Sequence, residues 1–397
     1  MHNFYVSIYS ERDEDDTHFV AQYAYPTHRK LKFDTILNGG YGSCSFDLIL
    51  PETLCDYVYD TYIEYHVVVE DAQGTRLYEG AIVSLAKSYG GIKVKAAGYF
   101  GHGRYVYLNL LFTLPTVTDV IQACVDLCPW WDDNTAGVDD TTDVIVDKLN
   151  YSEDEIKVSD LVSEMLKFGS DVGANDIRGL YFAVWGDQTA WLTTEPNLRE
   201  IAPTGSTFSW FVFNKDLSST GTSFEFSSKD VVNKVRASYE LSEEDAEPDQ
   251  EYGPAETGWF EDEFSQDVYG VREGTVDVGK ANEVEAENIA QLAINKMAFP
   301  AQTEKVNIDG FIYTPEMCQK PAYLMRAGDI IEAADMDLIL TESGGDVQFS
   351  PISINRGMVM KTTYTVESNK MTVLIGDRVS GFERVMARNA FTAAGVE

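Results

Sequence analysis

The stretch RLYEGAIVSLAKSYGGIKVKAAGYFGHG, residues 76–103, decides how the first part of the chain folds. It is typical of two β-strands joined at Gly90-Gly91 and followed by a glycine-rich corner. Its second half, residues 92–97, alternates two lysines with apolar side chains, the period-two pattern of a half-buried strand. Its first half keeps no strict alternation, and a β-bulge near Gly80 would explain the slip. The pattern predicts an antiparallel hairpin, and nothing in it points to catalysis.

Strand patterns also fill the rest of residues 1–104. FYVSIYS (4–10) and YIEYHVVVED (62–71) are rich in β-branched and aromatic residues, and turn residues separate such segments. The acidic run at 11–16 is predicted to be the solvated tip of a hairpin. Short strands of this kind predict a small, curled antiparallel sheet, and we expect a first tube-like β-barrel over residues 1–104.

Helical patterns begin after this region. TVTDVIQACVDLCP carries one apolar stripe, and Thr116 with Asp119 is predicted to form a capping box at its N-terminus. SDLVSEMLKFG is a second helix, predicted to have Ser159 as its N-cap. LYFAVWGDQTAWLTT is typical of a hairpin that turns at Gly186-Asp187. Residues 105–205 therefore form a predicted mixed α/β module.

Strand patterns return after this module, in TFSWFVF, VVNKVRASYE and several later segments. We expect a second tube-like β-barrel over residues 206–378. Two features interrupt it: an acidic, apolar-poor segment at 241–258, predicted to be a solvated loop, and an amphipathic helix at 282–299. Asn282 and Glu285 are predicted to cap this helix with a capping box.

The remaining tail at 379–397 has no strong pattern. The fold class predicted from all segments is mainly β with an α/β insertion: two tube-like antiparallel β-barrels and a small mixed α/β module. Apolar residues make up 44% of the chain, which is enough for real cores and argues against wholesale disorder.

The chain is strongly acidic: 30 Lys and Arg stand against 65 Asp and Glu, a formal net charge of −35. Such a surface repels phosphates and argues against a protein that reads nucleic-acid sequence. It is compatible with DNA as a transient passenger, because a negatively lined channel would let a polyanion slide without sticking. A host that lives at high salt is a second explanation of the same excess.

The five cysteines are odd in number and irregular in spacing, which argues against a disulfide framework. Cys124 and Cys128, four residues apart on a predicted helix, are expected to be buried thiols. No apolar run approaches the roughly 20 residues that a membrane span needs, so no span is predicted. The N-terminus MHNFYVSIYS lacks the pattern of a signal peptide, and we expect synthesis and assembly in a host cytoplasm.

Residues with catalytic chemistry are present but form no motif. The five histidines are scattered, and the chain lacks an HExxH pair, a GxSxG elbow, a Walker loop and a CxxC pair. His66, in a strand pattern, is expected to be satisfied by its neighbours. With 65 acidic residues, pairs of carboxylates arise by chance and carry no information. We therefore predict no enzyme activity, no catalytic residue and no cofactor.

The segment DDNTAGVDDTTD, residues 132–143, partly matches a calcium-binding loop. Asp132, Asn134 and Asp143 fall at the first, third and twelfth positions of such a loop. Ala136 occupies the fifth position, where an oxygen ligand is expected, and the aspartate at the twelfth is shorter than the usual glutamate. A plain polar loop is the better interpretation, and no metal site is predicted.

The order of these features resembles the tail hub, or tail-tip, proteins of tailed viruses. The resemblance is carried by the LYEG strand with its glycine turn, by AGYF at the start of the helical module, and by YGSCSFDLILP and SDLVSEMLKFG. KVRASYE resembles the start of the second barrel, and VNIDGFIY with MRAGDIIEAAD the closing strands. Contractile-tail baseplate hubs and the spike hubs of type VI secretion are relatives of this family. Since the family has no invariant catalytic motif, the resemblance rests on the order of these segments along the chain and on their residue patterns.

The resemblance implies a structural virion protein of a bacteriophage or an archaeal virus, located at the tail tip or baseplate. It implies a homotrimer whose six barrels match a six-fold tail tube, close or adapt its distal end, and conduct DNA during ejection. The implied partners are the tail tube or distal tail protein, the tape measure protein, and tail fibre or spike proteins. The acidic excess is expected toward the channel and the outer surface, and depleted at chain–chain contacts.

A β-rich protein that binds or cleaves glycans is the alternative from another class. Clustered aromatic residues beside carboxylates would favour it, and Trp130-Trp131 with the acidic run behind them is the one such place in the sequence. A secreted surface adhesin is a third option, and the missing signal peptide argues against it.

Overall fold

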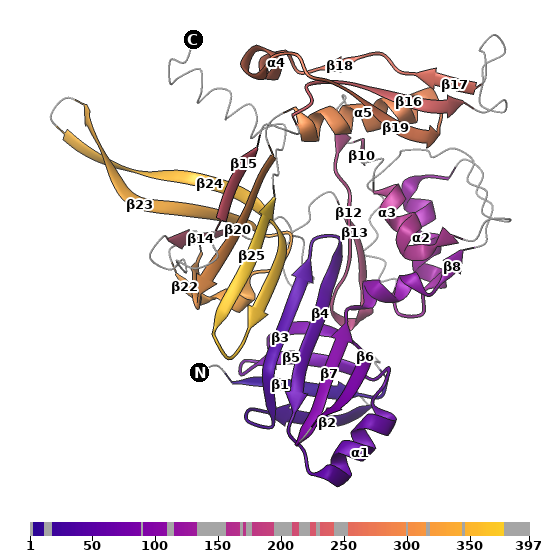
Figure 1. The fold of residues 1–397 in the computed structure, drawn as a ribbon, viewed down its shortest axis with the longest axis vertical. Coiled ribbons are helices and arrows are strands. Elements are labelled where there is room, and N and C mark those ends of the chain that lie inside the picture. Colours follow the sequence, from indigo (N-terminus) through magenta and orange to yellow (C-terminus); the bar gives the residue numbers. More distant parts are fainter. Residues whose placement is uncertain are drawn as a thin grey trace.

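The structure, a computed structural model, describes residues 3–11, 18–88, 90–108, 115–132, 156–166, 170–171, 177–193, 209–213, 223–227, 231–241, 253–298, 301–314, 318–343 and 346–376. Within these residues the chain is mainly β, as the sequence predicts (Figure 1). None of the described helices is long and apolar enough to cross a membrane.

The first β-region is one antiparallel sheet with the strand order β2-β1-β5-β6-β7-β4-β3. Its elements are β1 (Phe4–Tyr9), β2 (Phe19–Ala24), β3 (His28–Ile36), β4 (Gly39–Leu48), α1 (Glu52–Thr61), β5 (His66–Asp71), β6 (Arg76–Ser88) and β7 (Gly91–Ala97). Closure into a barrel would need β2 to pair with β3, but β3 pairs instead with β24 of the second β-region. The described sheet is therefore curled and open, and the predicted closed barrel is not found.

Two predicted hairpins of this region are confirmed. β6 and β7 pair across the predicted glycine turn, and β1 pairs with β2 on either side of the acidic run. Residues 12–17 of that run lie outside the described residues. β7 alternates as predicted: Ile92, Val94 and Ala96 are buried, and Lys93 and Lys95 are exposed.

β6 is irregular, as its sequence indicates, but its bulges do not lie at Gly80. The pairing with β5 skips Leu77, and the pairing with β7 skips Val83. Gly80 lies between them, where a Cβ atom would overlap the carbonyl oxygen of Ala97 on β7. The glycine is therefore required by the close approach of two backbones, and the bulges take up the change of alternation on either side.

The second β-region has the strand order β22-β21-β14-β23-β24-β25-β20-β15. Its elements are β14 (Ser209–Phe213), β15 (Ser223–Ser227), β20 (Ala301–Asp309), β21 (Phe311–Tyr313), β22 (Gln319–Pro321), η4 (Ala322–Leu324), β23 (Ile330–Ser343), β24 (Asp346–Thr365) and β25 (Lys370–Gly376). The prediction of a purely antiparallel sheet is wrong here, because β14 and β23 run parallel.

The two β-regions share one sheet and one core. Residues 361–365 of β24 pair antiparallel with residues 32–36 of β3, so the sheet continues from one region into the other. Beneath this seam, the ring of Phe4 lies 5.2 Å from that of Tyr323 and 6.0 Å from that of Tyr364. All three belong to a single hydrophobic cluster with side chains from both regions. Burying this apolar area holds the regions together.

Residues between the two β-regions form helices and short strands. These elements of the α/β module are η1 (Tyr99–Arg104), β8 (Tyr107–Leu108), α2 (Val117–Leu127), β9 (Ile156–Lys157), α3 (Val158–Met165), β10 (Ser170–Asp171), β11 (Ile177–Arg178), β12 (Tyr181–Val184), η2 (Gly186–Gln188) and β13 (Ala190–Thr193). The capping box of Thr116 and Asp119 is confirmed. Ser159 as the N-cap of α3 is wrong: the cap is Lys157, which is still extended in β9, and the buried Val158 already lies in the helix.

A fourth unit separates β15 from β20 in the chain. It consists of β16 (Lys234–Leu241), β17 (Gly253–Glu256), β18 (Phe260–Glu261), α4 (Glu263–Tyr269), β19 (Glu273–Lys280) and α5 (Glu283–Met297). Its four strands form their own sheet, and α5 packs on it over a separate core. The capping box of Asn282 and Glu285 at α5 is confirmed.

This unit corrects two interpretations of the sequence. KVRASYE forms β16 of the separate sheet and does not begin the second β-region, so the predicted unit 206–378 contains two sheets. The segment 241–258 is not all loop, because Gly253–Glu256 pairs with β16 as β17. Residues 242–252 lie outside the described residues. The acidic composition conceals a strand whose Ala255 packs against the core of the unit.

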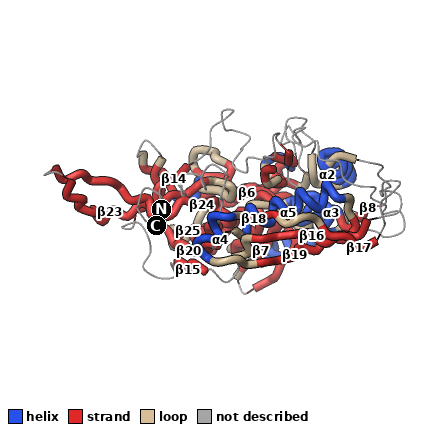
Figure 2. Tube along the Cα trace, turned by 90° about the horizontal axis from the view of Figure 1, so that it is seen from above, coloured by secondary structure: helices blue, strands red, loops and turns tan. Residues whose placement is uncertain are grey.

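The elements are arranged along an elongated molecule. The fourth unit and α1 lie at opposite ends, and the hairpin of β23 and β24 extends away from the rest of the chain (Figure 1). Seen from above, this hairpin and the helices α2 and α3 lie at opposite sides (Figure 2). The α/β module meets the first β-region through β12, which runs parallel to the start of β4.

The contact of β12 with β4 depends on Gly40. Its φ angle is +83°, and a Cβ atom there would overlap the backbone of Val184. We expect Gly40→Ala to lower the free energy of unfolding by at least about 3 kcal/mol, because left-handed strain and displacement of β12 add. Gly74→Ala is the matched control, with φ +79° in open space and an expected cost of about 1 kcal/mol. Equal losses of thermal midpoint in the two variants would contradict this role of Gly40.

Candidate functional site at the junction of the sheets

The junction begins with a bulge that brings two charged residues of β6 together. Side chains alternate along a regular strand, so residues three apart lie on opposite faces. The bulge at Leu77 adds one residue, and Arg76 and Glu79 then share a side. Arg76 Nη1 lies 3.0 Å from Glu79 Oε2, and the Glu79 side chain is 0% exposed. A fully buried carboxylate is stable only if donors surround it.

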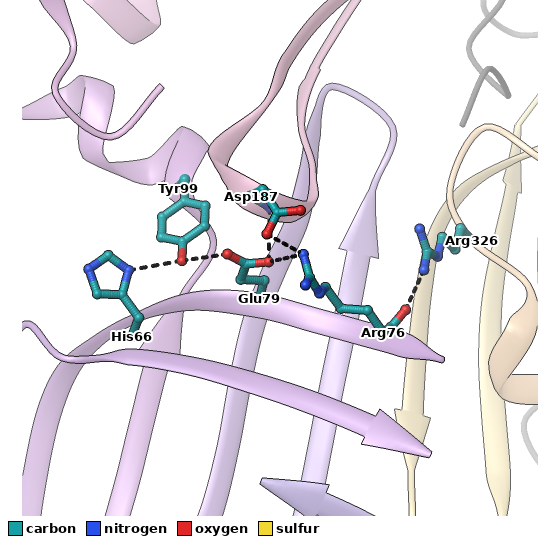
Figure 3. A network of polar contacts seen from close by, with 6 residues as sticks. All are labelled: His66, Arg76, Glu79, Tyr99, Asp187 and Arg326. Atoms are coloured by element: carbon teal, nitrogen blue, oxygen red, sulfur yellow. Dashed lines mark hydrogen bonds and ion pairs between the residues drawn. The ribbon is translucent and has the colours of Figure 1, made fainter. Parts of the chain in front are cut away.

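The donors to Glu79 come from three different segments. Tyr99 Oη donates to Oε1 over 3.0 Å, and the backbone N–H of Asp187 donates to Oε2 over 3.1 Å, beside the Arg76 guanidinium. His66 Nδ1 lies 2.9 Å from Tyr99 Oη. Because the tyrosine proton points to the carboxylate, His66 must donate to the tyrosine oxygen, which fixes its tautomer. Figure 3 shows this chain of contacts.

The tip of the β12–β13 hairpin is fixed on β6. Asp187 and Gln188 both have positive φ angles, 54° and 62°, which is unusual for residues other than glycine. Besides its N–H contact with Glu79, Asp187 accepts from Arg76 Nη1 over 2.6 Å. Burial disfavours the Arg76 charge, but Glu79 and Asp187 outweigh it and raise the pKa of Arg76. These charge-assisted contacts stabilise the tip in its left-handed conformation.

Arg326 connects the second β-region to the same place. Its Nη2 donates to the carbonyl oxygen of Arg76 (Figure 3). Its guanidinium also lies 5.6 Å from the ring centres of Tyr41 on β4 and Trp185 at the hairpin. Tyr41 and Trp185 themselves pack edge to face at 5.1 Å. The two β-regions and the α/β module therefore meet in one set of charged and aromatic contacts.

A second set of polar contacts lies at the seam between the two β-regions. Thr35 Oγ1 accepts from the N–H of Ala327 over 2.8 Å and lies 2.7 Å from Thr362 Oγ1. Asp329 Oδ2 accepts from Trp210 Nε1 over 2.7 Å and from the N–H of Arg326 over 2.9 Å. This Asp329 contact positions the segment that carries Arg326. Because these groups are hydrogen-bonded to one another, the arrangement suits a rigid joint.

Trp130 and Trp131, the place considered for glycans, take part in packing. Trp131 is 5% exposed, and its Nε1 donates to the carbonyl oxygen of Tyr99 over 3.0 Å. Trp130 stacks on His102 with ring centres 4.5 Å apart and lies 4.9 Å from the ring of His66. The face of Trp131 is thus not open to a sugar. His66 is satisfied by its neighbours, as predicted.

The remaining sequence candidates are partly described. Of residues 132–143 only Asp132 lies within the described residues, where it bridges to Thr189 through its backbone. Cys124 and Cys128 are buried free thiols, as predicted, and burial raises their pKa to about 12 and about 11. Cys318, in contrast, is exposed. Within the described part of the chain, no three His, Cys, Asp or Glu side chains are grouped as a metal site would need.

Sequence reasoning did not single out the residues of the junction. Glu79 had the clearest signal, since a lone acidic residue within the otherwise apolar LYEGAI marks a buried charge that needs partners. Asp187 and Arg326 are more than one hundred residues away from it in the chain. Only the pairing of strands reveals that they meet Glu79 and Arg76.

The architecture is shared with solved tail proteins. The chain has the fold of these proteins, two of which come from prophages, so the resemblance seen in the sequence is confirmed for the fold. No family model and no curated protein matches the sequence.

Three similar solved structures are tail proteins. A tail protein from Neisseria meningitidis MC58 has a TM-score of 0.55 at 12% identity, covering 94% of this chain and 96% of its own. Prophage tail protein gp18 from Listeria monocytogenes EGD-e has a TM-score of 0.52 at 13% identity, and the match covers 98% of both chains. The 43 kDa tail protein of prophage MuSo2 from Shewanella oneidensis has a TM-score of 0.52 at 10% identity, and the match covers 94% of this chain and 96% of the tail protein. The likeness therefore extends over the whole chain, and it is a likeness of fold.

Replacing the buried carboxylate tests the junction. We expect Glu79→Gln to lower the free energy of unfolding by about 2–4 kcal/mol, because Arg76 loses its buried counter-charge and one amide donor faces other donors. Glu240→Gln, the same change on an exposed strand position, is the control and should cost less than about 0.5 kcal/mol. Thermal unfolding of both variants measures the difference. An unchanged midpoint in Glu79→Gln would show that the junction does not stabilise the fold.

His102 predicts a pH dependence. Burial lowers its pKa, an effect that Glu64 only partly opposes, and its Nε2 has no hydrogen-bond partner among the described residues. A histidine with a lowered pKa binds its proton more weakly in the folded state, so its stability contribution falls as pH drops below about 6.5. As the pH is lowered from 7.5 to 5.5, we expect the thermal midpoint of His102→Phe to rise relative to that of the wild type. A constant difference between the two proteins would contradict this.

Proposed function

We propose that the chain is a structural virion protein, the hub at the distal end of a virus tail tube. The observation that carries the proposal is the joining of two β-regions, strand to strand, into one sheet in a chain that matches solved tail proteins along its whole length. In this proposal, the sheet forms part of the wall of a tube. Each chain then supplies two neighbouring segments of a ring.

Three chains arranged in this way supply six β-regions, the number that fits a six-fold tube. Unpaired strand edges support assembly: within the described residues, β2 pairs only with β1, and β15 only with β20. Exposed edges of this kind tend to find a partner. The proposed neighbours are the tail tube or distal tail protein, the tape measure protein, and tail fibre or spike proteins. Assembly would take place in the host cytoplasm, with DNA as a transient passenger.

A structural rather than an enzymatic role is supported by how the polar residues are used. The buried carboxylate of Glu79 already accepts from Tyr99, Arg76 and Asp187, which leaves it no role as a proton acceptor for a substrate. Trp131 is buried, which speaks against the glycan alternative at that place.

The mass of the assembly tests the proposal. Light scattering of the purified protein, alone and mixed with a tail tube protein, should give multiples of three chains. Negative-stain images of particles labelled with an antibody against the chain should show the label at the tail tip. A stable monomer or dimer in complex with the tube protein, or label elsewhere on the particle, would overturn the proposal.

A further inference from the structure

The sheet that joins the two β-regions has one open face that crosses the seam. Residues directly opposite each other on paired strands lie on the same face. The register therefore links Lys95 on β7 to Ser45 on β4, Ser45 to Lys32 on β3, and Lys32 to Thr365 on β24. It continues from Thr365 to Lys370 on β25. These side chains point away from the core, into which their neighbours in sequence are packed.

The charge of this face is opposite to that of the chain. In the whole sequence acidic residues outnumber basic ones by 65 to 30, yet here the basic side chains outnumber the acidic ones. The basic residues are Arg29, Lys30, Lys32, Lys93, Lys95, Lys305, Lys361 and Lys370, and the acidic residues are Asp34, Asp47, Asp309 and Glu367. We name this surface the lysine face.

Ion pairs neutralise only part of the positive charge of the lysine face. Three lysines are paired: Lys30 with Asp47 at 2.8 Å, Lys361 with Asp34 at 3.3 Å and Lys370 with Asp309 at 3.5 Å. Four others have no ion-pair partner among the described residues: Lys32, Lys93, Lys95 and Lys305. Lys93 and Lys95 on β7 and Lys32 on β3 lie on either side of β4, within one local patch. Such a patch attracts an anion with several charges.

The other side chains of the face indicate which anion. They are small and polar: Ser43, Ser45, Asn307, Thr363, Thr365 and Thr372. Its described residues include no aromatic side chain, and its apolar ones are Ile36, Ala97 and Leu374. Protein–protein interfaces are enriched in aromatic residues and depleted in lysine and serine. Phosphate oxygens, in contrast, are contacted by lysine, serine, threonine and asparagine.

We propose that the lysine face contacts the phosphate backbone of double-stranded DNA without reading its sequence. A sheet of several strands is too broad to enter a groove, so base edges stay out of reach. The net charge of −35 does not forbid the contact, because at 0.1 M salt charges farther than about 10 Å are largely screened. The place of this contact in a tail channel rests on the proposed function. It replaces the expected acidic lining with a basic one along the seam.

Binding of a labelled DNA duplex tests the proposal on the full-length protein. The probe is a fluorescein-labelled duplex of about 24 base pairs, followed by anisotropy at 100 mM NaCl. We expect the triple variant Lys32→Gln, Lys93→Gln, Lys95→Gln to weaken binding at least about tenfold, equally for AT-rich and GC-rich duplexes. The matched control is Arg104→Gln, Lys157→Gln, Lys320→Gln, which removes the same charge from exposed positions outside the face and should change binding less than about threefold.

Several outcomes would overturn the proposal. They are no binding by the wild type, equal weakening by the two triple variants, or displacement of the duplex by poly-glutamate at an equal concentration of charge. The last would assign the face to an acidic protein partner. Unchanged thermal midpoints of both variants verify that they fold. If the protein is not trimeric but the lysine face still binds the duplex, the hub proposal fails and this one stands.

Discussion

A single buried carboxylate dictates how the parts of this chain fit together. Glu79 is out of contact with water, and its charge is tolerated only because a guanidinium, a phenol and a backbone N–H reach it together. Those donors belong to β6, η1 and the hairpin tip between β12 and β13. If the α/β module moved away, the carboxylate would lose the donors Tyr99 and Asp187. The orientation of the module is therefore tied to the stability of the first β-region.

The local features of the fold could be predicted from the sequence, because they depend on neighbouring residues. Thr116 with Asp119 and Asn282 with Glu285 form their capping boxes as expected, since each box needs only residues three apart. The alternation in β7 likewise gives the correct buried face. Ser159 fails as a cap because Val158 is held in the module core, a tertiary effect that no local pattern contains. The acidic character of 241–258 hides β17 for a similar reason.

The long-range arrangement and the junction could not be predicted. KVRASYE has the pattern of a strand, but nothing in it tells which sheet it joins, and β16 lies in a separate unit. Barrel closure was expected because strands are short and curled, yet the free edge of β3 finds β24 rather than β2. Arg326 and Asp187 gain their roles only from that topology. The net charge of the chain does not reveal the lysine face for the same reason. It is a sum over the whole surface, whereas the register of the strands gathers the lysines on one face of the sheet.

The length of β24 has a mechanical consequence. One continuous strand, Asp346–Thr365, forms one side of the extended hairpin with β23 and then pairs with β3 at the seam. Antiparallel hydrogen bonds lie perpendicular to their strands, so a pull on the hairpin along β24 loads the bonds to β3 in shear, all at once rather than one by one. Force applied at the tip of the hairpin therefore reaches the seam along one continuous backbone, without passing through a loop, and passes to the first β-region through the hydrogen bonds between β24 and β3.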